Sequence, residues 1–358
     1  MRIVNVQLAQ HAYPIYVGSG ARAQLGGLIQ EQAGAKRVVV IADEHVAGLH
    51  WKDLQTSIPG SPTLITFTPG ENAKSLATAS QLYDRLAEEH VERRDLIVAL
   101  GGGVTGDLAG FVAATWLRGL RLLQVPTTLE AAIDASVGGK TALNHRSAKN
   151  LIGVFHQPVG VIIDTDLLGS LPRRDFVAGL SESIKHAAIR DAAFMAWHEH
   201  SIDKIAERDP ATLMELISRN CEIKADVVCR DEREYNLRAI LNYGHTVGHG
   251  IEHVLGYELR HGECVALGVL AENSIAVKRG MLAPADADRI AALIARVGLP
   301  TRLPRAIGRA ELLAAAHLDK KVQGGAVHLI LLRGLGRPER VADITDDEIA
   351  SSLEAISA

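Results

Sequence analysis

Polar side chains with acid, base and amide chemistry recur at helical spacing between residues 234 and 249. Separated by steps of four, four, three and four, they are Glu234, Arg238, Asn242, His245 and His249. At about 100° per residue these steps place all five on one face of a helix, where a core helix would be apolar. Such a face predicts a catalytic or metal-binding surface.

Two of these side chains have metal-ligand spacing. His245 and His249 stand at i and i+4, by which two imidazoles can share one metal ion, and His261 follows after a predicted loop. Glu182 and Lys185 are one helical turn apart on another segment. A carboxylate from that segment with His245 and His261 would complete a three-ligand site with open positions for substrate. The alternatives are satisfied or solvent-facing histidines and a solvated acid–base pair.

A glycine-rich turn is the second chemical signal. The sequence GGGVTGD, Gly101 to Asp107, follows the apolar run DLIVAL and precedes a helical pattern at 108–117. A strand, a glycine turn and a helix start together form a cradle for pyrophosphate, because backbone N–H groups and the helix dipole can face the anion. The Rossmann fingerprint also needs an acidic residue about twenty positions later, which is absent here, so Asp43 is the candidate ribose partner. A tight turn without a ligand is the alternative.

The stretch from Val125 to Pro158 has little regular periodicity and many polar groups. Those suited to phosphate, carboxylate or hydroxyl groups are Thr127, Thr128, Asp134, Lys140, Lys149 and Asn150. Gly138 to Thr141 ends like a P-loop, but Asp134 stands where that motif requires its first glycine. The stretch is predicted to be a binding loop, with an ordinary exposed connection as the alternative.

The predicted elements divide the chain into two domains. Up to residue 170, apolar runs alternate with helical patterns, which predicts an α/β domain with a mostly parallel sheet. Its expected strands are 3–8, 13–17, 37–42, 64–67, 95–100, 122–125 and 161–163, with a helix at 73–90. From residue 171 an all-α domain is predicted. Its expected helices are 174–208, 211–230, 237–254, 264–279, 284–297 and 309–316, with a strand at 326–332 and a last helix after Thr345, where Glu348 completes a capping box.

Length and composition restrict the class of protein. The chain has 358 residues, 47% hydrophobic and 22% charged, as expected for a soluble two-domain enzyme. A net charge of −4 without a basic cluster argues against a nucleic-acid partner. Three cysteines without CxxC spacing favour a reducing cytoplasm. Because no segment has the length and apolarity of a signal core or a membrane span, a cytoplasmic protein without a membrane partner is expected.

Eight segments, in order, resemble the 3-dehydroquinate synthases of the shikimate pathway. They are GGGVTGDLAGF, QVPTT, DASVGGKTALNH, KNLIG, GLSESIK, LRAILNYGHTVGHGIE, LRHGE and LDKK. The resemblance, from about Tyr13 to Gly336, implies a homodimeric lyase with a Rossmann-like NAD-binding domain at 1–170 and an α-helical metal and substrate domain at 171–358. It implies conversion of 3-deoxy-D-arabino-heptulosonate 7-phosphate into 3-dehydroquinate and phosphate. Bound NAD⁺ and one divalent metal ion, usually zinc, with cobalt possible, would support transient oxidation, phosphate elimination, re-reduction and aldol closure.

The same resemblance implies roles for individual residues. The metal ligands would be Glu182, His245 and His261, and the proton acceptors Glu234 and His249. Contacts with NAD⁺ are implied for Asp43, Gly70, Glu71, Asn72, Lys74, Gly103, Val104, Thr105, Gly106, Asp107, Thr127, Thr128 and Lys149. Contacts with the substrate are implied for Asp134, Lys140, Asn150, Lys185, Lys224, Arg238, Asn242 and one of the pair Lys320 and Lys321.

Departures from the family pattern leave other interpretations open. Tyr243 and Val247 stand where Leu and Phe are usual, and Ser181 and Ser183 lie in the segment often written GLAEVIK. A related sugar-phosphate cyclase, such as an amino-dehydroquinate synthase, is therefore one alternative. A metal-dependent polyol dehydrogenase is another, although an uncharged polyol would not need the lysines and Arg238. A non-enzymatic NAD-binding regulator is the third, and it gives no reason for acid, amide and imidazole groups on one helix face.

Overall fold

The computed structural model describes the chain except residues 34, 257, 319–326 and 358. The chain folds into two compact units. Unit 1 consists of Met1–Pro172 and Arg208–Arg233, and unit 2 of Arg173–Glu207 and Glu234–Ala358. The division expected near residue 170 differs from this in one segment, because residues 208–233 return to unit 1.

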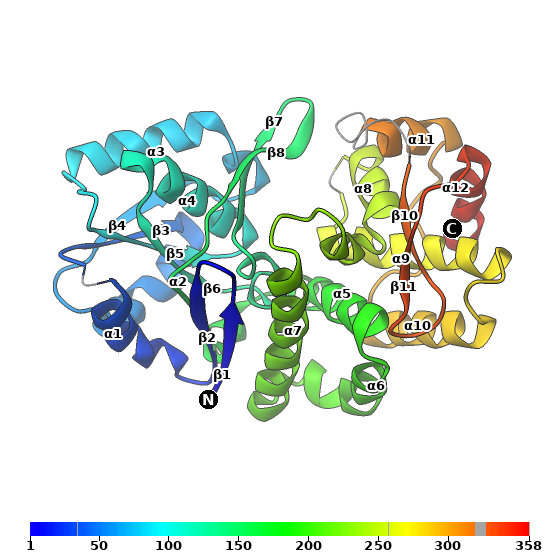
Figure 1. The fold of residues 1–358 in the computed structure, drawn as a ribbon, viewed down its shortest axis with the longest axis horizontal. Coiled ribbons are helices and arrows are strands. Elements are labelled where there is room, and N and C mark those ends of the chain that lie inside the picture. Colours follow the sequence, from blue (N-terminus) through cyan, green and yellow to red (C-terminus); the bar gives the residue numbers. More distant parts are fainter. Residues whose placement is uncertain (34, 257, 319–326, 358) are drawn as a thin grey trace. The chain divides into compact units, whose positions relative to one another are not determined.

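Unit 1 is built on a seven-stranded sheet with the order β1-β2-β9-β6-β5-β3-β4 (Figure 1). The strands are β1 (Arg2–Gln7), β2 (Ala12–Gly18), β3 (Val38–Asp43), β4 (Thr63–Phe67), β5 (Leu96–Gly101), β6 (Arg121–Pro126) and β9 (Gly160–Asp164). β1 pairs with β2 antiparallel, whereas the other pairings in the sheet are parallel. The predicted strands and the mostly parallel sheet are therefore confirmed.

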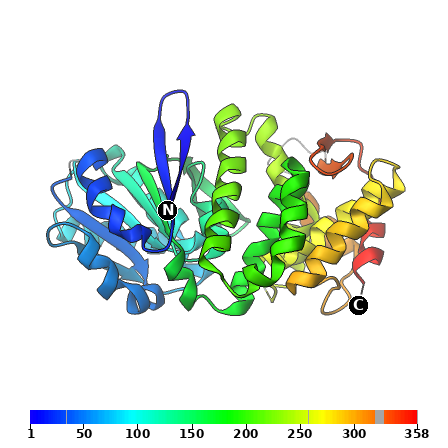
Figure 2. The same cartoon turned by 90° about the horizontal axis from the view of Figure 1, so that it is seen from below.

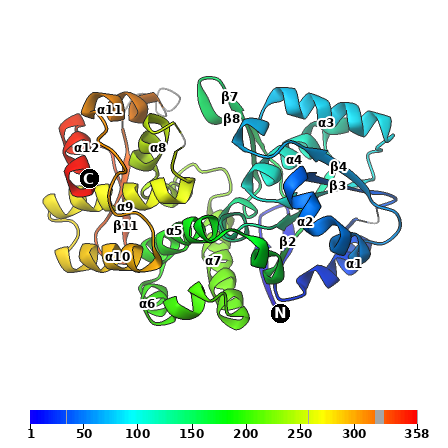
Figure 3. The same cartoon turned by 180° about the vertical axis from the view of Figure 1, so that it is seen from behind.

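Helices cover both faces of this sheet. They include α1 (Leu25–Leu28), α2 (Glu44–Leu54), α3 (Leu76–Glu88) and α4 (Gly103–Thr115). Val40 packs in one core cluster with residues of α1 and α2, and its neighbour Ile41 packs in another with residues of α3 and α4. The helices α1 and α2 therefore lie on one face of the sheet, and α3 and α4 lie on the other (Figures 1 and 3). Because successive side chains of a strand point to opposite faces, a sheet covered on both sides needs apolar residues at nearly every position.

The helix α7 (Pro210–Arg230) belongs to unit 1 because it packs against β1 and β2. Asp209 caps its N-terminus and accepts a hydrogen bond of 2.9 Å from the N–H of Thr212. Arg2 of β1 and Glu215 of α7 form an ion pair. The β1–β2 hairpin extends beyond the rest of the sheet (Figure 2). The sequence predicts this helix, but its periodicity does not show which unit the helix joins.

A second hairpin occupies the stretch for which the sequence predicts a loop, and that prediction is wrong. β7 (Lys140–His145) pairs with β8 (Ala148–Phe155) in antiparallel register, and β7 packs against α4. Every residue of β8 is exposed or half-buried. A strand without a buried face lacks the alternation by which strands are recognised in a sequence.

Unit 2 is mainly helical. Its helices are α5 (Arg173–Arg190), α6 (Ala192–Ala206), the 3-10 helix η8 (Leu237–Asn242), α8 (His245–Val254), α9 (His261–Lys278), α10 (Pro284–Val297), α11 (Arg309–Leu318) and α12 (Asp346–Ser352). Thr345 and Glu348 form the predicted capping box. A hairpin of β10 (Leu329–Leu332) and β11 (Pro338–Val341) accompanies them, and β10 packs against α9. The fold class, an α/β unit with an α-helical unit, is confirmed; β11 was not predicted.

Two long helices expected from the sequence are interrupted. The one expected at 174–208 breaks at Asp191, which caps α6 by accepting a 2.9 Å hydrogen bond from the N–H of Phe194. The one expected at 237–254 breaks at Gly244, whose φ of +78° is left-handed. The five polar residues therefore do not share one helix face: Arg238 and Asn242 lie on η8, His245 and His249 lie on α8, and Glu234 precedes η8 with a φ of +61°. Within the described part of the chain, no helix is long and apolar enough to cross a membrane.

Candidate functional site

The glycine turn has the predicted strand–turn–helix structure. β5 ends at Gly101, Gly102 is the N-cap of α4, and the first intrahelical hydrogen bond runs 3.0 Å from the N–H of Gly106 to the carbonyl of Gly102. A Cβ at Gly101 would lie 2.3 Å from Thr105 Oγ1, so a side chain has no room there. The first N–H groups of α4 have no intrahelical acceptor and are suited to an anion.

Asp43 lies at the carboxyl end of β3, the strand beside β5. Ala42 pairs with Leu100, one residue before the glycine turn. The Asp43 carboxylate caps α2 and accepts a 2.8 Å hydrogen bond from the N–H of Val46. The carboxyl ends of adjacent parallel strands are where α/β sheets bind nucleotides, so the position of Asp43 suits its predicted ribose contact.

A polar network beside this helix start joins several predicted cofactor residues. Lys74, which is 5% exposed, donates 2.7 Å to Asp107 Oδ2 and also donates to Asn150 Oδ1. Glu71 accepts a 2.8 Å hydrogen bond from Asn144. Burial raises the pKa of Asp107, and the Lys74 ammonium opposes that rise. Asn144 was not among the predicted site residues, although it lies in the segment DASVGGKTALNH, which carries part of the family resemblance.

Other predicted residues of unit 1 lie on separate elements. Lys224 of α7 lies 2.5 Å from Asp134 Oδ1 and donates a 2.6 Å hydrogen bond to the carbonyl of Asp134. Thr127 donates its N–H to the carbonyl of Gly101 at 2.9 Å, which fixes the turn after β6 against the glycine turn. Lys140 is exposed at the start of β7. Of the predicted substrate residues in unit 1, Asp134 and Lys224 are therefore in direct contact.

Three predicted metal ligands of unit 2 converge on one point. Glu182 lies on α5, His245 begins α8 and His261 begins α9. His245 Nε2 and His261 Nε2 each lie 3.6 Å from Glu182 Oε1. Two imidazole nitrogens and a carboxylate oxygen from three helices are a donor set that fits a divalent transition-metal ion.

The other ring nitrogen of each imidazole faces an acceptor. His245 Nδ1 lies 3.1 Å from the carbonyl oxygen of Tyr243. His261 Nδ1 lies 3.6 Å from Oε2 of Glu252, a buried carboxylate of α8. Acceptors at Nδ1 favour the tautomer that presents the Nε2 lone pair to a metal. Sequence reasoning missed Glu252, because no spacing relates it to His261.

His249 adjoins the same group. The ring centroids of His245 and His249 are 5.3 Å apart, and those of His249 and His261 are 5.6 Å apart. Ligand atoms of the three imidazoles all lie within 4.8 Å of one another. His249 is thus close enough to act on a ligand of the metal site, and its predicted proton-acceptor role stays a prediction.

Electrostatics in this region favour an anionic carboxylate and neutral imidazole. Glu182 is buried and ion-paired with Lys185. Burial alone would raise the pKa of Glu182, but Lys185 and the neighbouring histidines hold that pKa well below its usual range. Burial, followed by the Lys185 ammonium, lowers the pKa of His245 well below its usual value. Both groups therefore have the protonation state that metal ligation requires.

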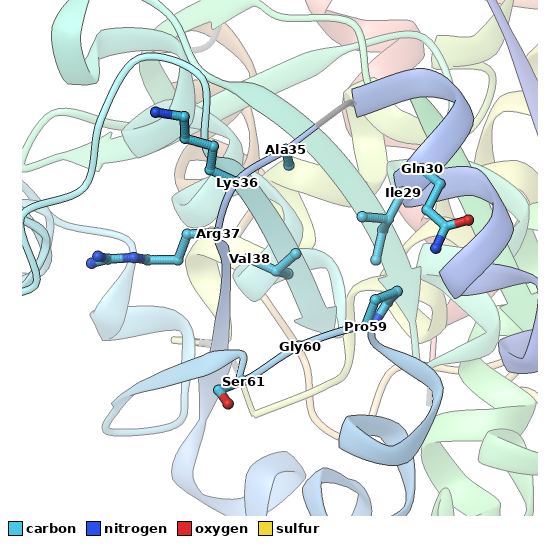
Figure 4. Close-up of a pocket in the computed structure, with 9 residues that line it drawn as sticks. All are labelled: Ile29, Gln30, Ala35, Lys36, Arg37, Val38, Pro59, Gly60 and Ser61. Atoms are coloured by element: carbon cyan, nitrogen blue, oxygen red, sulfur yellow. The ribbon is translucent and has the colours of Figure 1, made fainter.

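The remaining predicted residues of unit 2 are placed around η8. Arg238 is buried, and Asn242 donates a 2.9 Å hydrogen bond to Glu234 Oε1. Lys320 and Lys321 lie outside the described residues. A hollow in unit 1, lined by Lys36, Arg37 and Val38, lies at the amino end of β3 (Figure 4). Because ligands of parallel sheets bind at the carboxyl ends of the strands, this hollow does not fit the nucleotide site.

Two family models match adjoining parts of the chain. The family model described as 3-dehydroquinate synthase N-terminal matches residues 64–178, and the model described as 3-dehydroquinate synthase C-terminal matches residues 179–322. The 3-dehydroquinate synthase of Desulforamulus reducens is 42% identical over 357 residues, covering 99% of each chain.

Solved structures of two sugar-phosphate cyclases are also similar. A 2-deoxy-scyllo-inosose synthase in complex with carbaglucose-6-phosphate, NAD⁺ and Co²⁺ has a TM-score of 0.92 at 26% identity, covering 99% of this chain and all of that one. The 2-epi-5-epi-valiolone synthase of Streptomyces hygroscopicus, with NAD⁺ and Zn²⁺ bound, has a TM-score of 0.89 at 28% identity, covering 99% of this chain and 98% of that one.

Proposed function

Because the chain belongs to the 3-dehydroquinate synthase family, we propose that it converts 3-deoxy-D-arabino-heptulosonate 7-phosphate into 3-dehydroquinate and phosphate. The two family models together match residues 64–322. Membership makes the chain an enzyme, a carbon–oxygen lyase. The structural observation that carries the proposal is the convergence of His245 Nε2 and His261 Nε2 on Glu182 Oε1.

One divalent metal ion is proposed to be bound by Glu182, His245 and His261. Zinc is the ion we expect, and cobalt is the alternative. Both ions suit a set of two imidazoles and one carboxylate, and the two similar cyclase structures contain Co²⁺ and Zn²⁺. The bound ion would supply Lewis acidity at a substrate hydroxyl. Lys185, ion-paired with Glu182, keeps the carboxylate anionic and adds a cation for the substrate.

NAD⁺ is proposed to bind to unit 1 at the carboxyl ends of β3, β5 and β6. Gly103 to Asp107 would present their backbone N–H groups to the pyrophosphate, with Thr127 and Thr128 beside them, and Asp43 would accept from the ribose. Gly70 to Lys74 and Lys149 would complete the contacts. NAD⁺ supplies an acceptor that takes a hydride and returns it, so the reaction has no net redox change.

The substrate is proposed to be bound through its phosphate, carboxylate and hydroxyl groups. The residues assigned to it are Asp134, Lys140, Asn150, Lys185, Lys224, Arg238 and Asn242. A dianionic phosphate and a carboxylate need several cations, which this set provides. Asp134 holds the Lys224 ammonium in place, so Lys224 would meet the substrate in a fixed orientation.

Proton transfer is assigned to Glu234 and His249. Oxidation of a ring hydroxyl to a ketone acidifies the adjacent C–H bond, and a base that removes that proton allows phosphate to leave. His249 adjoins the two histidine ligands, and the hydrogen bond from Asn242 orients the Glu234 carboxylate. A positioned base contributes typically about 10²–10⁴-fold to the rate.

A related cyclase activity is the second candidate function. The two cyclase structures above are similar over nearly the whole chain, but at 26% and 28% identity, against 42% for the 3-dehydroquinate synthase. The experiment is a substrate panel. Purified protein with NAD⁺ and Zn²⁺ is given the heptulosonate 7-phosphate, its amino analogue or glucose 6-phosphate, and phosphate release is measured. We expect the heptulosonate to be used with the highest kcat/KM. Preference for either other substrate would contradict the assignment.

We also propose that the protein acts as a homodimer in the cytoplasm. This rests on the family resemblance of the sequence and on the absence of CxxC spacing among its three cysteines. Light scattering would measure the assembly. A mass of one chain, 38.4 kDa, at working concentration would contradict the dimer.

A further inference from the structure

The peptide group that joins Tyr243 to Gly244 makes hydrogen bonds through both its carbonyl and its N–H. Its carbonyl oxygen lies 3.1 Å from His245 Nδ1. Its N–H, from Gly244, donates a 2.8 Å hydrogen bond to Glu272 Oε2. One peptide therefore lies between a carboxylate and the imidazole assigned as a metal ligand.

The carboxylate is enclosed within unit 2. Glu272 lies on α9 and is 0% exposed. Its second oxygen, Oε1, accepts from the N–H of Val247 at 3.4 Å. The N–H groups of Gly244 and Val247 both lie at the N-terminus of α8, where the helix dipole favours a negative charge. Glu272 thus fixes the start of the helix on which His245 is the first residue.

The side chain of Tyr243 is fixed to the same helix. Its hydroxyl donates a 2.6 Å hydrogen bond to Oδ1 of Asn273, and both side chains are buried. The backbones also approach closely, because a Cβ at Gly268 of α9 would lie only 1.9 Å from the carbonyl oxygen of Gly244. The 243–244 peptide therefore has little freedom to rotate.

We infer that Glu272 is a positioning residue that acts on His245 through the 243–244 peptide, assisted by Tyr243 and Asn273. A carboxylate that accepts from the peptide N–H polarises the peptide, and its carbonyl then accepts more strongly from Nδ1–H of the imidazole. The effect is to fix the tautomer and raise the donor strength of Nε2, as a carboxylate in direct contact does for other metal-binding histidines. For His245, the 243–244 peptide lies between the Glu272 carboxylate and the imidazole. His261 differs, since Glu252 faces its Nδ1 directly at 3.6 Å.

This inference rests on the proposed metal site, and its test has a readout besides activity. The full-length protein is stripped with chelator and titrated with Co²⁺, and its dissociation constant and visible absorption are recorded. We expect Glu272→Gln, which keeps the size but removes the charge, to bind Co²⁺ about 10–100-fold more weakly, as for other residues behind metal ligands, with a shifted visible band. Tyr243→Phe should also weaken Co²⁺ binding and shift the visible band, in the same direction as Glu272→Gln but by a smaller amount.

The matched control is Tyr13→Phe. Tyr13 is also buried, and its hydroxyl accepts a 3.1 Å hydrogen bond from the N–H of Gly138 in unit 1. The Tyr13→Phe variant should have a lower free energy of unfolding but an unchanged Co²⁺ absorption spectrum. Unchanged affinity and spectrum in folded Glu272→Gln would overturn the inference. If that variant does not fold, an unchanged Tyr243→Phe would overturn it instead. A parent protein that binds no Co²⁺ would overturn the metal site and the inference together.

Discussion

His245 Nε2 lies 3.6 Å from Glu182 Oε1, although the two residues are 63 positions apart and belong to different helices, α8 and α5. A buried carboxylate and a neutral imidazole at this separation can both bind one ion that lies between them. The ion pair with Lys185 balances the charge of Glu182. The proposed roles of the individual histidines can be separated by mutation.

His245→Ala and His249→Ala should fail in different ways. His245→Ala removes one of the three proposed ligands and should purify with little metal. His249→Ala keeps all three, so it should retain metal and NAD⁺ while turnover falls by about 10²–10⁴-fold. Elemental analysis and phosphate release measure the two effects, and the melting temperature checks folding. Loss of metal from His249→Ala alone would mean that the two roles are reversed.

Lys140→Ala should weaken substrate binding much more than NAD⁺ binding. Lys140 is exposed at the start of β7, so its removal should cost little stability. The lost charge-assisted hydrogen bond is worth roughly 1.5–3 kcal/mol, which is about a 10- to 150-fold rise in the substrate dissociation constant. Lys52→Ala, an exposed lysine of α2, is the control. Calorimetry that found normal substrate affinity for Lys140→Ala would remove this residue from the site.

Asp43→Asn should separate the capping role of Asp43 from its proposed ribose contact. Asn caps a helix about as well as Asp, so the free energy of unfolding should change little while NAD⁺ affinity falls roughly tenfold or more. Asp43→Ala should also lose about 1 kcal/mol of stability. Asp209→Asn, at the N-cap of α7, should change neither quantity. Equal NAD⁺ affinity in the parent and Asp43→Asn would contradict the ribose contact.

Gly244→Ala should destabilise unit 2 more than its backbone angle alone explains. Gly244 and Gly60 have nearly equal φ angles of +78° and +79°, but a Cβ at Gly244 would lie 2.6 Å from Val269 Cγ2, whereas nothing lies within 4 Å at Gly60. The left-handed conformation costs about 1–2 kcal/mol in both variants. The crowding should add about 1–3 kcal/mol for Gly244→Ala only. Urea denaturation measures the difference, and equal losses would contradict the steric argument.

Local signals were sufficient for the nucleotide half. The run DLIVAL followed by GGGVTGD predicts a buried strand, a turn and a helix start, and the structure places Gly102 at the N-cap of α4. The glycines at 244 and 248 predict close approach, and a Cβ at Gly248 would lie 2.9 Å from the carbonyl oxygen of Cys264. The strand, turn and helix start depend on residues near in sequence, which is why the sequence alone shows them. The glycines indicate only that something approaches closely, because their neighbours on α9 are distant in the chain.

Long-range contacts could not be predicted in the same way. The left-handed turn at Gly244 is stabilised by Glu272, 28 residues away, so helical periodicity alone predicts one helix where there are two. The hairpin β7–β8 lacks a buried face on β8, so it shows no alternation. Glu252 and Glu272 face the histidine region only because α8 packs against α9, a relationship that no motif spacing records.

The most direct test of the proposed reaction is phosphate release and NADH absorbance, followed together during turnover of 3-deoxy-D-arabino-heptulosonate 7-phosphate. Hydride is taken and returned within each cycle, so we expect many phosphate molecules to be released per enzyme with no lasting rise in the NADH band. The same protein stripped of metal should release none until Zn²⁺ or Co²⁺ is added back. Accumulation of one NADH for each substrate consumed, or no phosphate release with metal and NAD⁺ present, would contradict the account.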